Sequence, residues 1–380
     1  MTHFARRAAA GLASLAAIWL LPAGAQAQNA LGANFNEHYE DVAYPDLERS
    51  GTQWVRIFVS MPEIDRFGAA DHGAVKTILD VSKHGYKTIL TLKHAYIGVP
   101  FPQAGGDTYR KDIERVDAVL RQVMGKIDIL VIGNEPFIES RPVDRNANFN
   151  AYYEGLAKRA IEYRAKHCGE GCKTRIYMGA LKQLERPEAR TPATERWMEF
   201  VRTTPEIDGV TIHPHVARIE ASKDYVDYIL PRMRADQTFL VTEFSIVRWW
   251  ERHMKSPIPA SFADKYGLPR ETLNWQVIRS ALDKPFPKAK WDDFLSASPW
   301  FESRKHYLRN QMKMFRDTGK LAVATYAFKQ GSSMGRNFGP RTTPWLLNSV
   351  VAARTVERNG DGTAAFNYAW IDDYKALQKQ

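Results

Sequence analysis

Two glutamates in this chain directly follow short segments that read as buried strands. Residues 127–132 are mostly apolar and run into Gly133-Asn134-Glu135-Pro136, and residues 239–242 run into Glu243. A side chain at the end of a buried strand stands where the backbone turns toward solvent and ligand. Cleaving an acetal between two sugars requires an acid at the departing oxygen and an anion on the other side of the ring. We interpret Glu135 and Glu243 as a candidate pair for this chemistry, one kept protonated by burial and the other kept ionised by hydrogen-bond donors.

Four polar residues at other predicted strand ends are candidate partners of this pair. Arg56 ends the second strand and is expected to hold Glu243 ionised, because a nearby cation lowers the pKa of a carboxyl group. Asn134 can donate to a sugar hydroxyl beside the anomeric carbon. His213 and His215 can bond the substrate or a carboxylate.

Each of these candidates also has a structural interpretation. Arg56 could be an ion-pair former, and a zinc site at His213 and His215 would need a third protein ligand. Glu139 is the residue most easily mistaken for the acid. We predict no metal and no organic cofactor.

The elements that must position these residues alternate between strand-like and helix-like patterns. Nearly every strand precedes a helix of about 8 to 20 residues, which predicts a single (β/α)8 barrel. An open doubly wound sheet usually has a glycine-rich nucleotide turn after its first strand, and this chain has none. The predicted strands are 31–35, 54–58, 87–92, 127–132, 174–180, 209–213, 238–242 and 321–326.

The connection after the seventh strand is unusually long. In a barrel, an insertion such as residues 244–301 is expected over the catalytic face. Its tryptophans could stack on sugar rings or pack an inserted subdomain, with Trp249 and Trp250 the candidates for substrate contact. The loop 94–107 could form the opposite wall. The tryptophans of the insertion are Trp249, Trp250, Trp275, Trp291 and Trp300.

The first residues read as an export signal. Arg6 and Arg7 precede an apolar run, and Ala25-Gln26-Ala27 is a small-x-small cleavage site, so residues 1–27 are predicted to be removed and residues 28–380 to form the barrel. A retained membrane anchor is the alternative, but the run is shorter than the roughly 20 residues that span a bilayer. We expect a periplasmic or secreted protein without stable membrane insertion.

Charge and cysteine content fit an exported protein. The formal net charge is +10, and loss of the leader removes two arginines from it. A positive surface attracts anions, which for an exported protein are acidic polysaccharides rather than nucleic acid, and no nucleic-acid-binding motif is present. Cys168 and Cys172 predict a disulfide across a tight loop.

The combination of these residues resembles clan A of the glycoside hydrolases. In that clan an Asn-Glu pair closes strand four and a glutamate closes strand seven, as Asn134-Glu135 and Glu243 do here. Two positions depart from the pattern. His215 stands where the clan often has a tyrosine, and Tyr326, Phe328 and Lys329 stand where it often has a tryptophan.

The resemblance implies a retaining double displacement with Glu243 as nucleophile and Glu135 as acid and base. We expect an endo-acting, monomeric enzyme on a microbial polysaccharide. Lys93, His94 and Tyr326 are further candidates for substrate binding, and Lys93, His94, Lys329 and Arg336 favour an acidic substrate. A transglycosylase and a barrel that binds polysaccharide without cleaving it remain alternatives.

Overall fold

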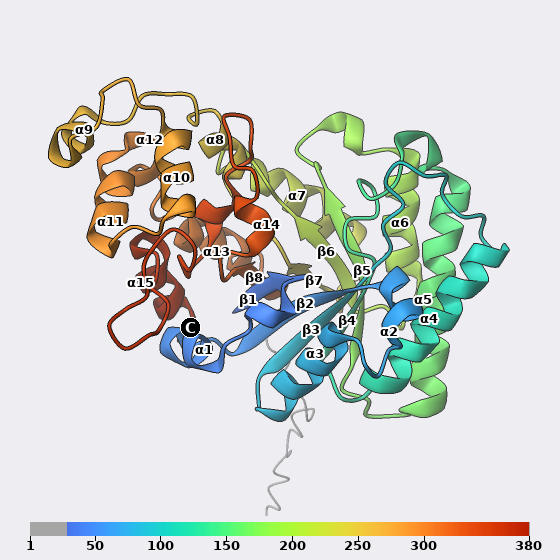
Figure 1. Cartoon of the computed structure of the whole chain (residues 1–380). Helices are drawn as coiled ribbons and strands as arrows, with labels where there is room; N and C mark the ends of the chain where they lie inside the picture. The colour runs from blue at the N-terminus through green and yellow to red at the C-terminus, as the bar shows by residue number, and fades with distance from the viewer. Residues whose placement is uncertain (1–28, 380) are drawn as a thin grey trace, which may run out of the picture.

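The computed structural model describes residues 29–379 and contains a closed barrel of eight parallel strands in sequence order (Figure 1). Each strand pairs with the next, and β1 pairs with β8 to close the barrel. The predicted barrel is therefore confirmed, while the predicted leader lies outside the described residues. The strands are β1 (Ala30–Asn36), β2 (Trp54–Ser60), β3 (Lys87–Lys93), β4 (Ile129–Ile132), β5 (Arg175–Lys182), β6 (Gly209–His213), β7 (Thr238–Val241) and β8 (Leu321–Ala327).

Helices connect consecutive strands along the outside of the barrel. In α4 the apolar residues Val116, Leu120 and Val123 form one buried face, as their spacing predicts. Thr191 caps α6 by accepting from the Thr194 backbone, and Pro192 occupies the first turn, where its missing N–H costs nothing. The connecting helices are α1 (Tyr44–Ser50), α2 (Ile64–Phe67), α3 (Gly73–Lys83), α4 (Asp107–Val123), α5 (Ala147–His167), α6 (Pro192–Thr203), α7 (Ala221–Ile229) and α13 (Tyr307–Arg316).

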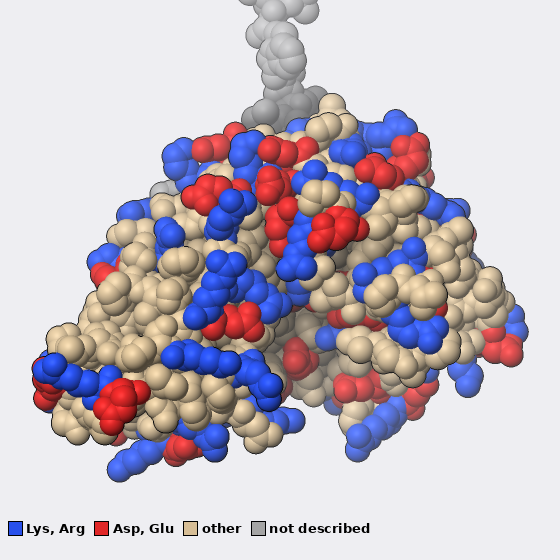
Figure 2. All heavy atoms as spheres, turned by 90° about the horizontal axis from the view of Figure 1, so that it is seen from above, with Lys and Arg blue, Asp and Glu red and all other residues tan. Residues whose placement is uncertain are grey.

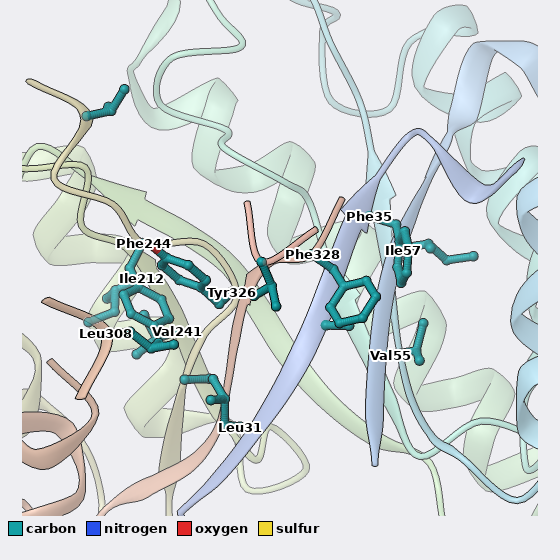
Figure 3. Close-up of a cluster of buried hydrophobic side chains, with 14 of the residues drawn as sticks. Leu31, Phe35, Val55, Ile57, Ile212, Val241, Phe244, Leu308, Tyr326 and Phe328 are labelled. Carbon is teal, nitrogen blue, oxygen red and sulfur yellow. The ribbon is translucent and has the colours of Figure 1, made fainter. Parts of the chain in front are cut away.

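Two sets of buried side chains form the core. The smaller set comes from the strands alone and includes Ile129, Tyr177 and Leu240, and the Tyr177 hydroxyl bonds Thr238. The larger set joins the strands to the surrounding helices. Figure 3 shows part of it, in which Phe244 and Tyr326 lie together beside Leu308 of α13. Strands packed on both sides explain why the strand sequences are almost continuously apolar.

The connection after β7 is largely helical rather than a loop. Trp250 and Trp291 are fully buried, and Trp300 is only 8% exposed, so these rings pack the helices against one another. Of the two roles considered for the tryptophans of this insertion, these three therefore have the structural one: they pack an inserted helical segment. Figure 1 shows α9 to α12 grouped at one side of the barrel. The helices are α8 (Val247–Glu251), α9 (Ala260–Tyr266), α10 (Asn274–Asp283), α11 (Lys288–Ala297) and α12 (Pro299–Glu302).

The chain after β8 returns across the barrel before it ends. It forms α14 (Ser332–Gly335), the 3-10 helix η6 (Trp345–Asn348) and α15 (Tyr368–Leu377), and α15 packs on α13. The predicted disulfide is confirmed: Cys168 and Cys172 are bonded directly after α5. Among residues 29–379, no helix has the length and apolar character needed to cross a membrane.

Candidate active site

Glu135 follows β4 through a turn that requires glycine. Gly133 has a φ of 87°, and a Cβ at this position would lie 2.8 Å from Pro136 and 3.0 Å from Tyr153. The turn directs Asn134 and Glu135 toward the open end of the barrel. The Glu135 backbone N–H then donates to the Glu139 carboxylate at 3.2 Å. Glu135 remains largely buried, with 8% of its surface exposed.

Glu243 stands close to Glu135 although 108 positions separate them in the sequence. An oxygen of each carboxylate belongs to a group of side-chain atoms that all lie within 4.8 Å of one another. Both glutamates line one pocket of about 360 Å³. The carboxyl groups of retaining glycosidases stand about 5–5.5 Å apart, and those of inverting enzymes about 6.5–9.5 Å apart. The two oxygens are closer together here than the carboxyl groups of inverting enzymes are.

Arg56 is fully buried and lies within β2 rather than at its end, and it joins Glu243 to Asn134. Its Nη1 donates to Glu243 at 2.7 Å, and its Nη2 donates to the Asn134 amide oxygen at 2.6 Å. The same guanidinium also donates to Asn34, Asn36 and Thr91. A guanidinium with this many partners has one available orientation. Arg56 therefore fixes the positions of Glu243 and Asn134 relative to each other.

Glu139 holds the other side of the Asn134 side chain. The Asn134 amide nitrogen donates to Glu139 at 2.9 Å. Glu139 does not line the pocket, and burial raises its pKa. Lys93 lies 3.5 Å from it and partly offsets that effect. Of the two carboxyls near Asn134, it is thus Glu135 that faces Glu243, and Glu139 positions the turn.

The two histidines at the end of β6 contact the carboxylates differently. His213 Nδ1 lies 2.8 Å from Glu135, and its Nε2 lies 2.7 Å from the Thr242 hydroxyl. His215 Nδ1 bonds Ser245, while its buried Nε2 has no hydrogen-bond partner and lies 3.5 Å from Glu243. His213 therefore orients Glu135, and His215 presents a free ring nitrogen between the two acids.

Lys182, the last residue of β5, is a site residue that the sequence prediction missed. Its ammonium lies 2.9 Å from both oxygens of Glu135. The register of β5 against β6 shifts between Met178 and Leu181, and a Cβ at Gly179 would lie 2.5 Å from the Gly133 carbonyl oxygen. The glycine allows the end of β5 to approach the end of β4. The predicted strand stopped at residue 180, which left Lys182 outside it.

The charges around the pair determine its protonation. Burial raises the pKa of Glu135, but the hydrogen bond with His213 and the charge of Lys182 outweigh it and lower the pKa to about 2. Burial likewise opposes ionisation of Glu243, while His213 and Arg56 hold its pKa well below the usual range. The prediction that burial keeps Glu135 protonated is therefore wrong for the free protein, because the hydrogen bond with His213 and the charge of Lys182 hold the carboxylate ionised.

The neighbouring His215 is neutral at pH 7. Burial lowers its pKa to about 4, although Glu243 acts in the opposite direction. A neutral ring with a free Nε2 can donate or accept a hydrogen bond according to its tautomer. It can therefore contact a sugar hydroxyl held between the two carboxylates.

The four residues Glu135, His213, His215 and Glu243 could together offer ligand atoms to a metal ion. Arg56 and Lys182 already pair with the two carboxylates at 2.7 and 2.9 Å. A metal ion would have to displace these cations or share the anions with them. The donor set is therefore better suited to acid and base chemistry than to metal binding.

The pocket wall includes an aromatic ring that the sequence prediction did not identify. Trp345, in η6, lines the pocket, and its ring lies edge to face with His215 at 4.8 Å between centroids. The resemblance indicated that a tryptophan at the end of strand eight was missing, and Trp345 supplies an indole from the segment beyond that strand. Other lining residues outside the predicted set are Asn34, Asn36, Glu37, His38, Phe244, Ala327, Ser333, Met334 and Asn348.

Several residues predicted to bind substrate lie away from the pocket. Trp250 and Tyr326 are fully buried, and Tyr326 packs on Phe244 and Trp370 (Figure 3). His94 is 1% exposed and faces Tyr152 and Asp112. The prediction that these three side chains contact sugar is therefore wrong, because almost none of their surface is exposed.

The remaining predicted residues are bound elsewhere. Trp249 donates to the Trp300 carbonyl oxygen and lies under Arg304. Lys93 lies over Phe58 and near Glu139. Lys329 pairs with Asp41 at 3.6 Å, and Arg336 borders a different surface depression. The aromatic and basic character of these residues was visible in the sequence, but their burial and direction were not.

Figure 2 shows the face of the molecule seen from above. A hollow lies near its middle, with Asp or Glu side chains at its base and Lys or Arg side chains along its sides. This face of the molecule is therefore open to a ligand.

No protein-family model and no curated protein matches the chain. Solved structures do match. A β-glucosidase from Exiguobacterium marinum aligns at 8% identity with a TM-score of 0.51, covering 92% of this chain and 97% of the other. An endo-1,4-β-xylanase from Penicillium canescens aligns at 12% identity with a TM-score of 0.52, covering 93% and 96%. A GH10 xylanase from Bispora sp. MEY-1 aligns at 12% identity with a TM-score of 0.52, covering 93% of this chain and 97% of the other. The chain therefore shares its (β/α)8 fold with glycosidases.

Proposed function

We propose that this protein is a retaining glycoside hydrolase acting on a polysaccharide or oligosaccharide. The observation that carries the proposal is the pair of carboxylates at the ends of β4 and β7, with oxygens within 4.8 Å in one pocket. The (β/α)8 fold that the chain shares with glycosidases supports it, and the two glutamates follow β4 and β7, as the resemblance to clan A of the glycoside hydrolases implies.

In the first step, Glu243 attacks the anomeric carbon while the bond to the leaving oxygen breaks. Arg56 keeps the attacking carboxylate ionised and oriented, and the neutral His215 ring lies 3.5 Å from it. Glu135 gives its proton to the leaving oxygen, so the leaving sugar departs as an alcohol. The products of this step are a glycosyl ester on Glu243 and an ionised Glu135.

In the second step, a water molecule attacks the same carbon. Glu135 now acts as a base and takes a proton from the water, and the ester bond to Glu243 breaks. The sugar keeps its original anomeric configuration, and both carboxyls return to their starting state. If a second sugar replaces water, the same residues perform a transglycosylation.

Export from the cell remains part of the proposal. The leader predicted from residues 1–27 and the disulfide between Cys168 and Cys172 both suit an oxidising compartment. Polysaccharides outside the cytoplasm are then the substrates that the enzyme meets.

The proposal is tested by screening the purified protein on a panel of neutral and acidic polysaccharides and sizing the products. We expect the wild type to cleave at least one of them. Glu243→Gln should lower kcat at least about 1,000-fold, since it removes the nucleophile. Glu135→Gln should do the same on natural linkages but retain more activity on an aryl glycoside whose leaving group needs no proton.

Glu154→Gln is the matched control. Glu154 is also paired with an arginine, Arg196 at 2.7 Å, but on the outer helices. This variant should keep wild-type activity. Near-full activity of Glu135→Gln or Glu243→Gln on the natural substrate would refute the role assigned to that residue.

A further inference from the structure

A second, smaller pocket adjoins the catalytic pocket, and Lys182 lines both. The smaller pocket has a volume of about 150 Å³ and is built by the turns that follow β4 and β5. Polar and basic side chains form much of its wall. The residues used below are Lys182, Arg145, Arg186 and Glu188.

The charge of this pocket is positive. Lys182, Arg145 and Arg186 face a single acidic lining residue, Glu188. Arg145 donates one bond to the Ser140 carbonyl oxygen, and its buried Nε has no partner. Arg186 is more exposed and lies 3.9 Å from Glu185. Burial also lowers the pKa of Arg145, which is the effect of a cation without a counter-charge.

Lys182 connects the smaller pocket to Glu135. An acid has to be within hydrogen-bond distance of the oxygen that it protonates. The Lys182 ammonium is itself 2.9 Å from the Glu135 carboxylate. A sugar whose oxygen contacts Glu135 therefore brings its own substituents next to Lys182 and into the mouth of the smaller pocket.

We propose that this pocket binds the carboxylate of a uronic acid in the leaving-sugar position, and that Lys182 moves from Glu135 to that carboxylate when substrate binds. This inference rests on the proposed function, because only a hydrolase that cleaves between two sugars has a leaving sugar. A carboxylate suits the site because Arg145 offers a planar guanidinium with an unused N–H beside a lysine point charge.

The movement of Lys182 also resolves the protonation of the acid. While Lys182 pairs with Glu135, the carboxylate stays ionised and cannot protonate a leaving oxygen. Transfer of the ammonium to the substrate removes that charge and raises the pKa of Glu135, which takes up a proton from solvent while His213 remains its neighbour. The proton passes to the leaving oxygen and is regained from water in the second step, so each cycle balances. An acidic substrate thereby activates its own acid.

The test measures binding of two oligosaccharides that differ only in their carboxylates. The probes are the β-1,4-linked tetramer of glucuronic acid and its carboxyl-reduced form, cellotetraose. Calorimetry is performed with the full chain carrying Glu243→Gln, so that neither probe is consumed. We expect the acidic tetramer to bind at least about tenfold more tightly at low salt. Adding Lys182→Met should reduce the ratio of the two affinities to below about twofold. Arg145→Met should also reduce this ratio.

Lys329→Met is the matched control, because Lys329 also pairs with a single carboxylate and lines a different depression. It makes the same change of net charge and should leave the ratio unchanged. Lys182→Arg should keep the preference, and retained cellotetraose binding shows that a variant is folded. Equal affinities for the two probes in the parent protein, or a preference that survives Lys182→Met, would overturn the proposal. Because no turnover is measured, a failure of the hydrolase assignment is recognised separately by the polysaccharide panel.

Discussion

At the scale of single residues, Glu135 has a cation and a hydrogen-bonded imidazole against its carboxylate, which a protonated acid does not require. His213 and Lys182 both contact its carboxylate at under 3 Å. Glu243 shares its surroundings with Arg56 and His215. Both acids are therefore anions at neutral pH. They differ in how firmly the cation beside each of them is held. Arg56 is fixed by five acceptor groups, whereas Lys182 has Glu135 as its hydrogen-bond partner within the described residues.

Lys182→Met should change the pH dependence of activity on a neutral substrate. The variant loses a charge that lowers the pKa of Glu135, so that pKa rises and a larger fraction of the enzyme carries the protonated acid. We expect the basic limb of the kcat/KM profile between pH 4 and 8 to move to higher pH. For each pH unit by which the pKa of Glu135 rises, kcat/KM near neutral pH should increase about tenfold. An unchanged profile would show that Lys182 does not control the acid.

At the scale of the elements, the sequence predicted the strand ends better than the residues beyond them. Glu135 and Glu243 come within three residues of the ends of β4 and β7, so residue type and strand order were sufficient to pair them. Lys182 was missed because a register shift extends β5 beyond its apolar run. Trp345 comes from a 3-10 helix well beyond β8, and only the return of the chain across the barrel brings it to His215.

The tryptophans show why residue type alone could not assign the walls of the site. Trp250 was a candidate for stacking on sugar, but its ring is fully buried between Phe301 and Trp370. Trp250 lies in α8, which has five residues and is too short to show a helical period, so the sequence did not indicate which face of this helix points inward. The burial of an aromatic ring in such a segment depends on tertiary contacts.

Trp345→Ala should therefore affect substrate binding, whereas Trp250→Ala should affect stability. Loss of the Trp345 ring from the pocket wall should raise KM by about 10-fold or more and leave Tm nearly unchanged. Trp250→Ala should lower the free energy of unfolding by about 3–5 kcal/mol, because it opens a cavity in the core, while KM stays close to the wild-type value. Thermal unfolding and steady-state kinetics on the same samples separate the two. A raised KM in a stable Trp250→Ala protein would return that ring to the binding site.

At the scale of the whole molecule, net charge and the open hollow act together. The chain carries a formal charge of +10, and Figure 2 shows basic side chains along the sides of the hollow. A positive field around a concave site increases the encounter rate of anions. The (β/α)8 fold by itself does not select for charge, so a preference for acidic polymers would have to come from charged side chains such as these.

The association of the acidic tetramer should therefore depend on salt. Between about 20 and 200 mM NaCl, screening should lower kcat/KM or the association rate several-fold for the glucuronic acid tetramer and leave cellotetraose almost unaffected. Stopped-flow or steady-state kinetics at constant pH measures this directly. Equal salt dependence for both probes would mean that the net charge does not guide substrate to the site.

The spacing of the two glutamates makes one prediction about the reaction as a whole. In an NMR time course of the anomeric proton, recorded on whichever polysaccharide the panel shows to be cleaved, the first sugar released should have the same anomeric configuration as the bond that was broken. Release of the opposite anomer would mean that water, not Glu243, attacks the sugar, and the double displacement by Glu243 and Glu135 would be contradicted.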